Sequence, residues 1–167
     1  MFTEKKSLEV LRKKIKKFPD QVVVLGSGWN KILEDMSVED TISYSSLFGV
    51  EATVPGHEGR LVVGTIGKKR VACMSGRVHM YEGYTAHQAT LPFRVLAQAG
   101  MKTLVLTAAC GPLHEKYKVG DFVILSDMIT LFLALDNPLK GPQFVDVSEV
   151  FDSKLRMKAR QICIQNS

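Results

Sequence analysis

The sequence predicts an α/β domain in which a mostly parallel mixed sheet is flanked by helices. Continuous apolar runs of strand length recur along the chain, as is typical of strands buried on both faces. Segments with helical apolar spacing alternate with these runs, and glycine-containing turns follow several of them. Strands are predicted at 21–25, 60–66, 69–74, 103–107 and 119–126, and helices before Pro19, at 29–36, at 85–99 and at the end of 145–164.

The length and composition fit one globular domain, predicted over residues 1–167. Hydrophobic residues make up 46% of the chain and charged residues 23%, the balance of an ordinary soluble protein. No apolar run reaches the length of a membrane span, and the first residues lack the apolar core of a signal peptide. Cys73, Cys110 and Cys163 are an odd number without close pairing, so neither a disulfide framework nor a metal site is expected. We therefore expect a cytoplasmic protein.

The basic excess of the chain lies in its first helix. Residues 1–20 carry seven basic and three acidic side chains, a net of +4 out of +5 for the whole chain. Four apolar residues at helical spacing give this helix one buried stripe: Leu8, Leu11, Ile15 and Phe18. Nucleic-acid binding is the alternative, but aromatic interleaving and a binding motif are both missing. A solvated surface helix is favoured, and no nucleic-acid partner is expected.

The first strand, 21–25, runs directly into Gly26-Ser27-Gly28 and then into the predicted helix 29–36. A strand, a glycine turn and a helix in this order place backbone N–H groups where an anion is favoured, and Ser27 adds a hydroxyl. The turn is not the dinucleotide fingerprint, because the third glycine is missing. Such a turn also serves simple chain reversal, so the anion site stays one of two interpretations.

Residues 38–54 show only short strand-like pieces, and the loop that follows contains two glycines, a proline and His57. Gly67-Lys68 between the strands 60–66 and 69–74 predicts a hairpin. Thr85 can cap the helix 85–99, which contains Pro92 and ends at Gly100.

A polar cluster follows the strand 69–74. Arg77, His79, Tyr81 and Glu82 lie between two glycines, and the odd-numbered side chains would share one face if the strand continued. Such donors leaving a strand end can receive an anion, although a polar surface loop is the equally plain alternative. In largely parallel sheets, ligands bind at the carboxyl ends of the strands. That rule brings Ser27, residues 77–81 and the small-residue turn 108–111 to one edge, which favours the anion site.

The ordered set of these motifs resembles the homotrimeric purine nucleoside phosphorylases. The matching stretches are Leu25-Gly-Ser-Gly28, Val54-Pro-Gly-His-Glu-Gly-Arg60, Gly76-Arg-Val-His-Met-Tyr-Glu-Gly-Tyr84, Leu104-Val-Leu-Thr107, Val119-Gly-Asp121 and Asn137-Pro-Leu-Lys-Gly-Pro142. The resemblance covers about the first half of the family's domain, so the fold is expected to be truncated at its C-terminal side. The family's purine-recognition residues lie in a segment beyond Ser167, and no purine-binding residue is expected in this chain.

The resemblance implies phosphorolysis of purine nucleosides to free base and ribose 1-phosphate, with inorganic phosphate as co-substrate and no cofactor. It assigns phosphate binding to Ser27, His57, Arg77, His79 and Ala109, a ribose contact to Tyr81, and the catalytic roles to His79, Arg77 and His57. It also implies a homotrimer, or a second chain that completes the domain.

Two departures concern the third turn, because the family has asparagine at the position of Ala108 and glycine at that of Pro112. The alternative to an enzyme is a truncated, non-catalytic remnant that binds phosphate or assembles with a partner chain.

Overall fold

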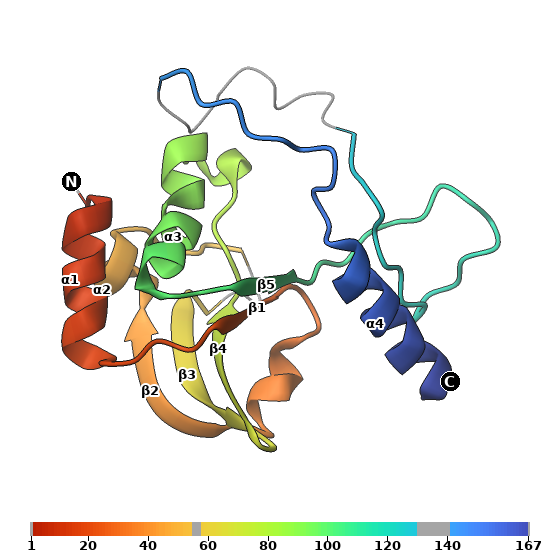
Figure 1. The fold of residues 1–167 in the computed structure, drawn as a ribbon, viewed down its shortest axis with the longest axis horizontal. Coiled ribbons are helices and arrows are strands. Elements are labelled where there is room, and N and C mark those ends of the chain that lie inside the picture. The colour runs from red at the N-terminus through yellow and green to blue at the C-terminus, as the bar shows by residue number, and fades with distance from the viewer. Residues whose placement is uncertain (1, 55–57, 130–140, 167) are drawn as a thin grey trace. The chain divides into compact units, whose positions relative to one another are not determined.

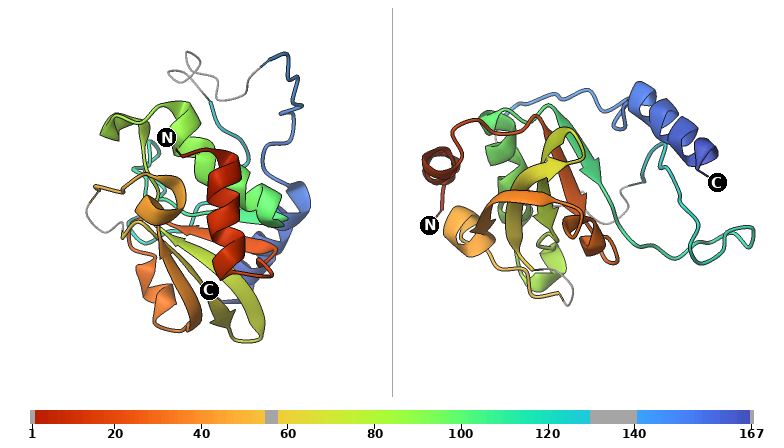
Figure 2. Two further views of the ribbon diagram at one scale, coloured as in Figure 1. Left: turned by 90° about the vertical axis from the view of Figure 1, so that its left-hand side faces the viewer. Right: turned by 90° about the horizontal axis from the view of Figure 1, so that it is seen from below.

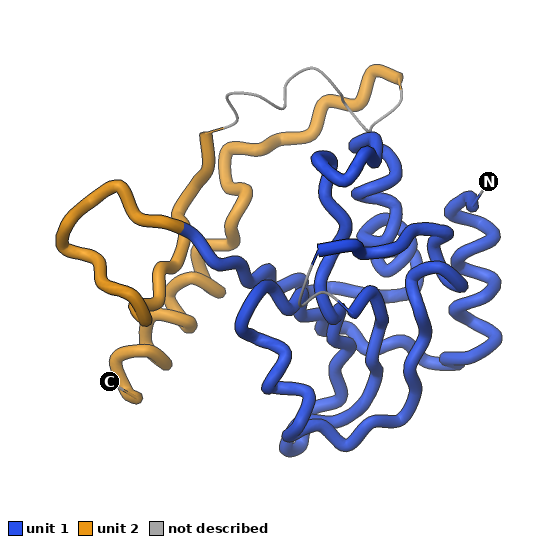
Figure 3. Tube along the Cα trace, turned by 180° about the vertical axis from the view of Figure 1, so that it is seen from behind, with its two compact units in different colours: residues 1–110 blue, residues 111–167 orange. Residues whose placement is uncertain are grey.

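The computed structural model describes residues 2–54, 58–129 and 141–166. Two compact units make up the chain, residues 1–110 and residues 111–167 (Figure 3). The first unit contains the sheet and the helices that cover it. The second contains helix α4, Ser153–Gln165. The single domain expected over residues 1–167 stays a prediction. Among the described residues, no helix combines the length and the apolar character needed to cross a membrane.

The first unit is built on a five-stranded sheet with the order β2-β3-β4-β1-β5 (Figure 1). The interior strand β1 runs parallel to both of its neighbours, β4 and β5. The pairs β2–β3 and β3–β4 are antiparallel, the latter across the expected hairpin at Gly67. These findings confirm the mixed sheet flanked by helices. The strands are β1 (Gln21–Leu25), β2 (Ser37–Ser43), β3 (Arg60–Ile66), β4 (Lys69–Ser75) and β5 (Thr103–Leu106).

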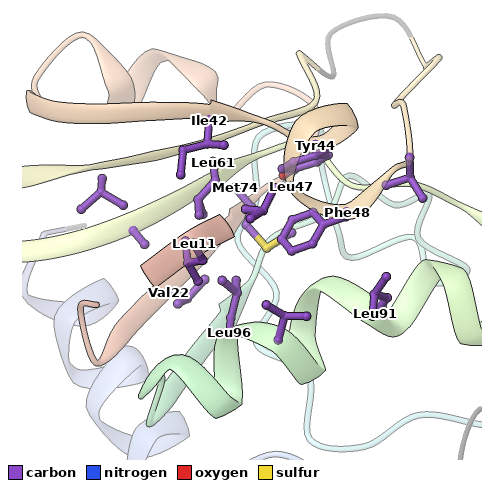
Figure 4. Close-up of a cluster of buried hydrophobic side chains, with 14 of the residues drawn as sticks. Leu11, Val22, Ile42, Tyr44, Leu47, Phe48, Leu61, Met74, Leu91 and Leu96 are labelled. Atoms are coloured by element: carbon purple, nitrogen blue, oxygen red, sulfur yellow. The ribbon is translucent and has the colours of Figure 1, made fainter. Parts of the chain in front are cut away.

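Each face of the sheet carries its own apolar cluster, because successive side chains of a strand point to opposite faces. On one face Val22, Leu61 and Met74 pack against apolar residues of three helices (Figure 4). These helices are α1 (Glu4–Lys14), α2 (Tyr44–Phe48) and α3 (Ala86–Ala99). On the other face Leu25 and Cys73 pack with side chains of a short 3₁₀ helix, η1 (Asn30–Leu33), and its flanks. The continuous apolar runs of the sequence thus reflect burial on both faces.

Helix α1 lies beside α3, as both views of Figure 2 and an ion pair show. Arg94 Nε donates to Glu4 Oε1 at 2.6 Å, and this hydrogen bond is the main reason why the pKa of Glu4 lies below its usual value. Helix α3 begins at the predicted cap, where Thr85 accepts from Gln88 N, and ends at Gly100 with a φ of 119°. Its predicted bounds are therefore confirmed.

Several sequence predictions were wrong in extent or type. The helix expected at 29–36 is the 3₁₀ helix η1, because its backbone bonds span three residues, as from Ile32 N to Trp29 O at 3.2 Å. The helix expected before Pro19 ends already at Lys14. The helix expected at the end of 145–164 is confirmed as α4, Ser153–Gln165. Residues 38–54, which the sequence left unassigned, supply most of β2 and the whole of α2.

The strand predicted at 119–126 is absent from the structure. A strand needs a neighbour that takes its hydrogen bonds, and within the described residues this segment pairs with none. Its apolar side chains are consequently exposed, Phe122 to 72%. The loop 54–60 and the loop 137–142, by contrast, lie partly outside the described residues.

Candidate functional site

Three turns of the first unit enclose one small pocket. They follow the carboxyl ends of β1, β4 and β5, which meet at one edge of the sheet because the three strands are parallel. The pocket has a volume of about 160 Å³, below the roughly 300–1,000 Å³ of sites for drug-sized ligands. It is lined by Gly26, Ser27, Val54, Arg77, His79, Tyr81, Ala108 and Ala109. None of these eight lining residues is acidic, so the pocket suits a small anion.

The first turn places Ser27 at its exposed tip. Trp29 N donates to Gly26 O at 3.1 Å, and Gly28 has a φ of 87°, a conformation that side chains other than glycine rarely adopt. Gly26 is needed for a different reason, which is close approach. A Cβ atom on Gly26 would lie 2.5 Å from the carbonyl oxygen of Thr107.

Thr107, directly after β5, joins the first turn to the third. Its Oγ1 accepts from Gly26 N at 2.9 Å and donates to Val24 O at 2.8 Å. Its carbonyl oxygen accepts from Arg77 Nη1 at 3.2 Å. One residue therefore fixes the spacing of all three turns, and it holds the Arg77 guanidinium at the pocket. The sequence analysis did not single out Thr107.

The second turn is anchored by backbone contacts before it reaches the polar cluster. Gly76 N donates to Leu25 O at 3.0 Å, and the buried hydroxyl of Tyr44 donates to Gly76 O at 2.7 Å. Burial is the reason that the pKa of Tyr44 is raised, so this hydroxyl remains a donor at neutral and moderately alkaline pH. These bonds therefore hold the backbone next to Arg77, a half-buried residue, in place.

The polar cluster does not continue the strand, contrary to the geometry considered from its alternating pattern. Strand β4 ends at Ser75, and a 3₁₀ helix, η2 (Met80–Glu82), follows His79. His79 and Tyr81 nevertheless reach the same pocket, where their rings stack with centroids 4.7 Å apart and planes within 12° of parallel. The Tyr81 side chain is open to solvent, with the residue 75% exposed.

The structure thus brings together five of the six residues that the resemblance assigned to phosphate and ribose: Ser27, Arg77, His79, Tyr81 and Ala109. His57, the sixth, lies outside the described residues. The lining residues Gly26 and Val54 were quoted in the motifs but not assigned a role. The roles of all these residues stay a prediction. A guanidinium, an imidazole, a hydroxyl and turn backbone around one small pocket can hold a phosphate-sized anion.

Comparisons with known proteins identify the family of the chain. The family model described as the phosphorylase superfamily matches residues 21–167. Purine nucleoside phosphorylase from Bos taurus is 38% identical over 150 residues, which are 84% of this chain and 52% of that protein. Purine nucleoside phosphorylase 1 from Geobacillus stearothermophilus is 35% identical over 163 residues, 92% of this chain and 58% of that protein.

Solved structures give the same answer at the level of the fold. Purine nucleoside phosphorylase from Schistosoma mansoni, in a complex with BCX-34, matches 98% of this chain and 63% of its own, with 36% identity and a TM-score of 0.85. A Schistosoma mansoni purine nucleoside phosphorylase in complex with inosine matches 98% of this chain and 60% of its own, with 36% identity and a TM-score of 0.83.

The chain spans about half the length of the curated relatives it matches. Over that span the sheet, the order of its turns and the sequence agree, and the chain belongs to the phosphorylase superfamily, with purine nucleoside phosphorylases as its relatives.

Proposed function

We propose that this chain takes part in the phosphorolysis of purine nucleosides, in which inorganic phosphate attacks ribose and releases the free purine base and ribose 1-phosphate. The observation that carries the proposal is the shared pocket of Ser27, Arg77, His79 and Ala109 at one sheet edge. The reaction proposed is the one for which the relatives named purine nucleoside phosphorylase are named. Because the chain spans about half of their length, the activity is proposed rather than transferred.

The residue types suit the chemistry. Cleavage of a glycosidic bond builds positive charge on the sugar ring, and a phosphate dianion beside the ring both stabilises that charge and supplies the nucleophile. The protein therefore has to strip water from phosphate and hold it in line. In this proposal Arg77 and His79 bind phosphate oxygens, Ser27 and the N–H of Ala109 donate to the others, and Tyr81 lies beside the ribose.

Further parts of the proposal follow the resemblance alone. His57 contributes to phosphate binding, and phosphate is the co-substrate without an added cofactor. The cytoplasmic location is proposed from the composition of the chain instead. The assembly is a homotrimer, or this chain combined with one that completes the domain. Gel filtration with light scattering on the purified chain measures the assembly.

Phosphate-dependent release of hypoxanthine from inosine tests the reaction. Arg77→Ala should lower kcat/KM by about 10²-fold, the loss expected when one preorganised donor to a developing charge is removed. Arg160→Ala, an exposed arginine of α4, is the matched control and should leave the rate unchanged. Equal rates for Arg77→Ala and the control would contradict the assignment of Arg77.

A second candidate is phosphate binding without turnover. The small volume of the pocket favours it, because the described lining offers room for an anion but less than a drug-sized ligand needs. Titration calorimetry with inorganic phosphate separates the two functions. Binding without release of hypoxanthine supports the second candidate, and the absence of any phosphate binding contradicts both.

A further inference from the structure

A second pocket of the first unit lies where the end of α1 meets the sheet, and we call it the α1 pocket. Its volume is about 480 Å³, against about 160 Å³ for the pocket of the three turns, and it falls within the roughly 300–1,000 Å³ of sites for drug-sized ligands. The two pockets share no lining residue. The α1 pocket is lined by the end of α1, the segment after it and three strands: Lys14, Ile15, Lys16, Lys17, Glu39, Asp40, Val63 and Arg70.

Arg70, on β4, joins two walls of the α1 pocket. Its Nη1 donates to Lys17 O at 2.5 Å, in the segment after α1. Its Nε donates to Glu39 Oε1 at 3.1 Å and to Glu39 Oε2 at 2.8 Å, on β2. The guanidinium therefore holds the segment after α1 near β2, and it neutralises the charge of Glu39.

Three lysines give the α1 pocket a basic side. Lys16 and Lys17 follow Ile15, the C-cap of α1, so they lie outside the last helical turn, where basic side chains stabilise a helix end. Within the part of the chain that the structure describes, no ion pair involves either of them or Lys14. The lining carries four basic and two acidic side chains, a net charge of +2. The α1 pocket therefore favours an anionic ligand.

The other lining groups suit the remainder of a nucleotide. Val63 and Ile15, which are 1% and 5% exposed, offer an apolar surface for a base. Asp40 Oδ1 accepts from Thr41 N at 2.7 Å, and among the described residues its Oδ2 has no partner. Carboxylate oxygens accept from ribose hydroxyls in dinucleotide sites. One pocket thus combines cations, an apolar surface and a carboxylate acceptor.

We propose that the α1 pocket binds a nucleoside polyphosphate: the three lysines hold the phosphates, Asp40 accepts from the ribose hydroxyls, and the base lies against the apolar residues. Lysine binds phosphate as a mobile point charge, so several lysines can serve a chain of phosphates without a fixed geometry. Inorganic phosphate groups carry the same charge, but they lack the hydroxyls and the base. The inference goes beyond the proposed function and does not depend on it, because the two pockets are lined by different residues.

Titration calorimetry with ATP on the 167-residue chain tests the site. The double variant Lys16→Gln/Lys17→Gln should weaken ATP binding about tenfold, as expected when two charge contacts near the surface are lost. Lys154→Gln/Lys158→Gln removes the same charge from two exposed positions of α4 and should leave ATP affinity unchanged. Arg77→Ala should also leave it unchanged, because Arg77 lines only the other pocket. Equal weakening in the two double variants, or loss of ATP binding in Arg77→Ala, would overturn the proposal.

Inorganic tripolyphosphate separates a nucleotide site from a site for phosphate groups alone. The wild-type chain should bind ATP about tenfold more tightly than tripolyphosphate, because only ATP offers hydroxyls to a charged acceptor. Asp40→Asn should lower this preference, since it keeps one oxygen for Thr41 N and replaces the other with an NH₂ group. Equal affinity for both probes in the wild-type chain would overturn the nucleoside part, and an unchanged preference in Asp40→Asn would overturn the role of Asp40.

Amide NMR shows which pocket ATP occupies. Bound ATP should shift the amide signals of Ile15 and Val63, which line the α1 pocket. Shifts confined to Ser27 and Ala109 would place ATP in the other pocket and overturn the inference. A chain that binds no ATP at all also overturns it, whereas phosphate calorimetry decides the proposed function separately.

Discussion

Replacing Gly26 with alanine tests the packing that brings the first and third turns together. Gly26 is buried, and its φ is not positive, so an alanine would meet no intrinsic backbone strain. The substitution is opposed only by close contacts between the added Cβ atom and its neighbours. The added Cβ atom would lie 2.5 Å from Thr107 O, 3.0 Å from the carbonyl carbon of Thr107 and 3.0 Å from Ala108 Cα. All three are backbone atoms, so no side chain can rotate away.

The cost follows from what has to move. Relief of these contacts displaces the backbone of residues 107–108, which weakens the hydrogen bonds of Gly26 N and Val24 O with Thr107. Overpacking of this kind destabilises by about 1–3 kcal/mol. For a unit of about 100 residues, a loss of 2 kcal/mol lowers Tm by roughly 8 °C. The same displacement moves Ala109, so phosphate affinity should fall with stability.

Differential scanning calorimetry and phosphate titration on one preparation measure both effects. Gly111→Ala is the matched control, because an added Cβ there meets nothing within 4 Å and Gly111 has no positive φ. If Gly26→Ala lowers Tm no more than Gly111→Ala and binds phosphate equally well, the close approach of the two turns does not define the pocket.

Three further predictions concern side chains near the pocket or packed against the sheet. Thr107→Val should cost about 1–2 kcal/mol in urea unfolding and weaken phosphate binding, because it removes the hydroxyl that bonds Gly26 N and Val24 O; Thr107→Ser should restore both, and failure to do so would point to the methyl group instead. Tyr44→Phe should cost about 1 kcal/mol by the same measurement, since it leaves Gly76 O without its buried donor; an unchanged unfolding midpoint would contradict this. Burial raises the pKa of Cys73 to about 11 from 9.0, so a thiol reagent at pH 8 should label the exposed Cys110 and Cys163 well before Cys73. Between pH 9 and 10 the native state keeps a Cys73 proton that the unfolded state loses, so Cys73 should lower stability by at most about 1.4 kcal/mol over that pH unit. Cys73→Ala should reduce the slope in this range, which lies below the pH at which Tyr44 titrates in the unfolded chain, and an equal slope in the variant would contradict the assignment.

Much of the first unit could be predicted from local sequence. Residues 22–25 are all apolar, and they contribute side chains to the apolar clusters on both faces of the sheet as part of the interior strand β1. The hairpin at Gly67 and the helix between Thr85 and Gly100 carry their signals within a few residues. The rule that parallel strands bring their carboxyl ends to one edge predicts that Ser27, Arg77 and Ala109 lie together, and all three line the pocket.

What could not be predicted depends on partners distant in sequence. Residues 119–126 have the apolar pattern of a strand, but the pattern does not say whether a neighbour is present, and among the described residues none pairs with them. In the sequence, Thr107 is simply a hydroxyl-bearing residue that follows a predicted strand. Its role arises only because β5 brings its hydroxyl into hydrogen-bonding contact with Gly26 N. The hydrogen bond from Thr53 N to Glu82 likewise depends on the path of the chain in space between the two residues, and their spacing in the sequence does not predict it.

The bond between Gly26 and Thr107 spans 81 positions of the chain. Contacts of such separation form late during folding, because closing a long loop costs entropy before any contact compensates it. A phosphate ion that needs the three turns can therefore bind only after β5 has docked beside β1. Ligand that binds the native state alone raises its stability by mass action. During refolding, the recovery of phosphate affinity would thus report the completion of the sheet, later than the recovery of helix signal.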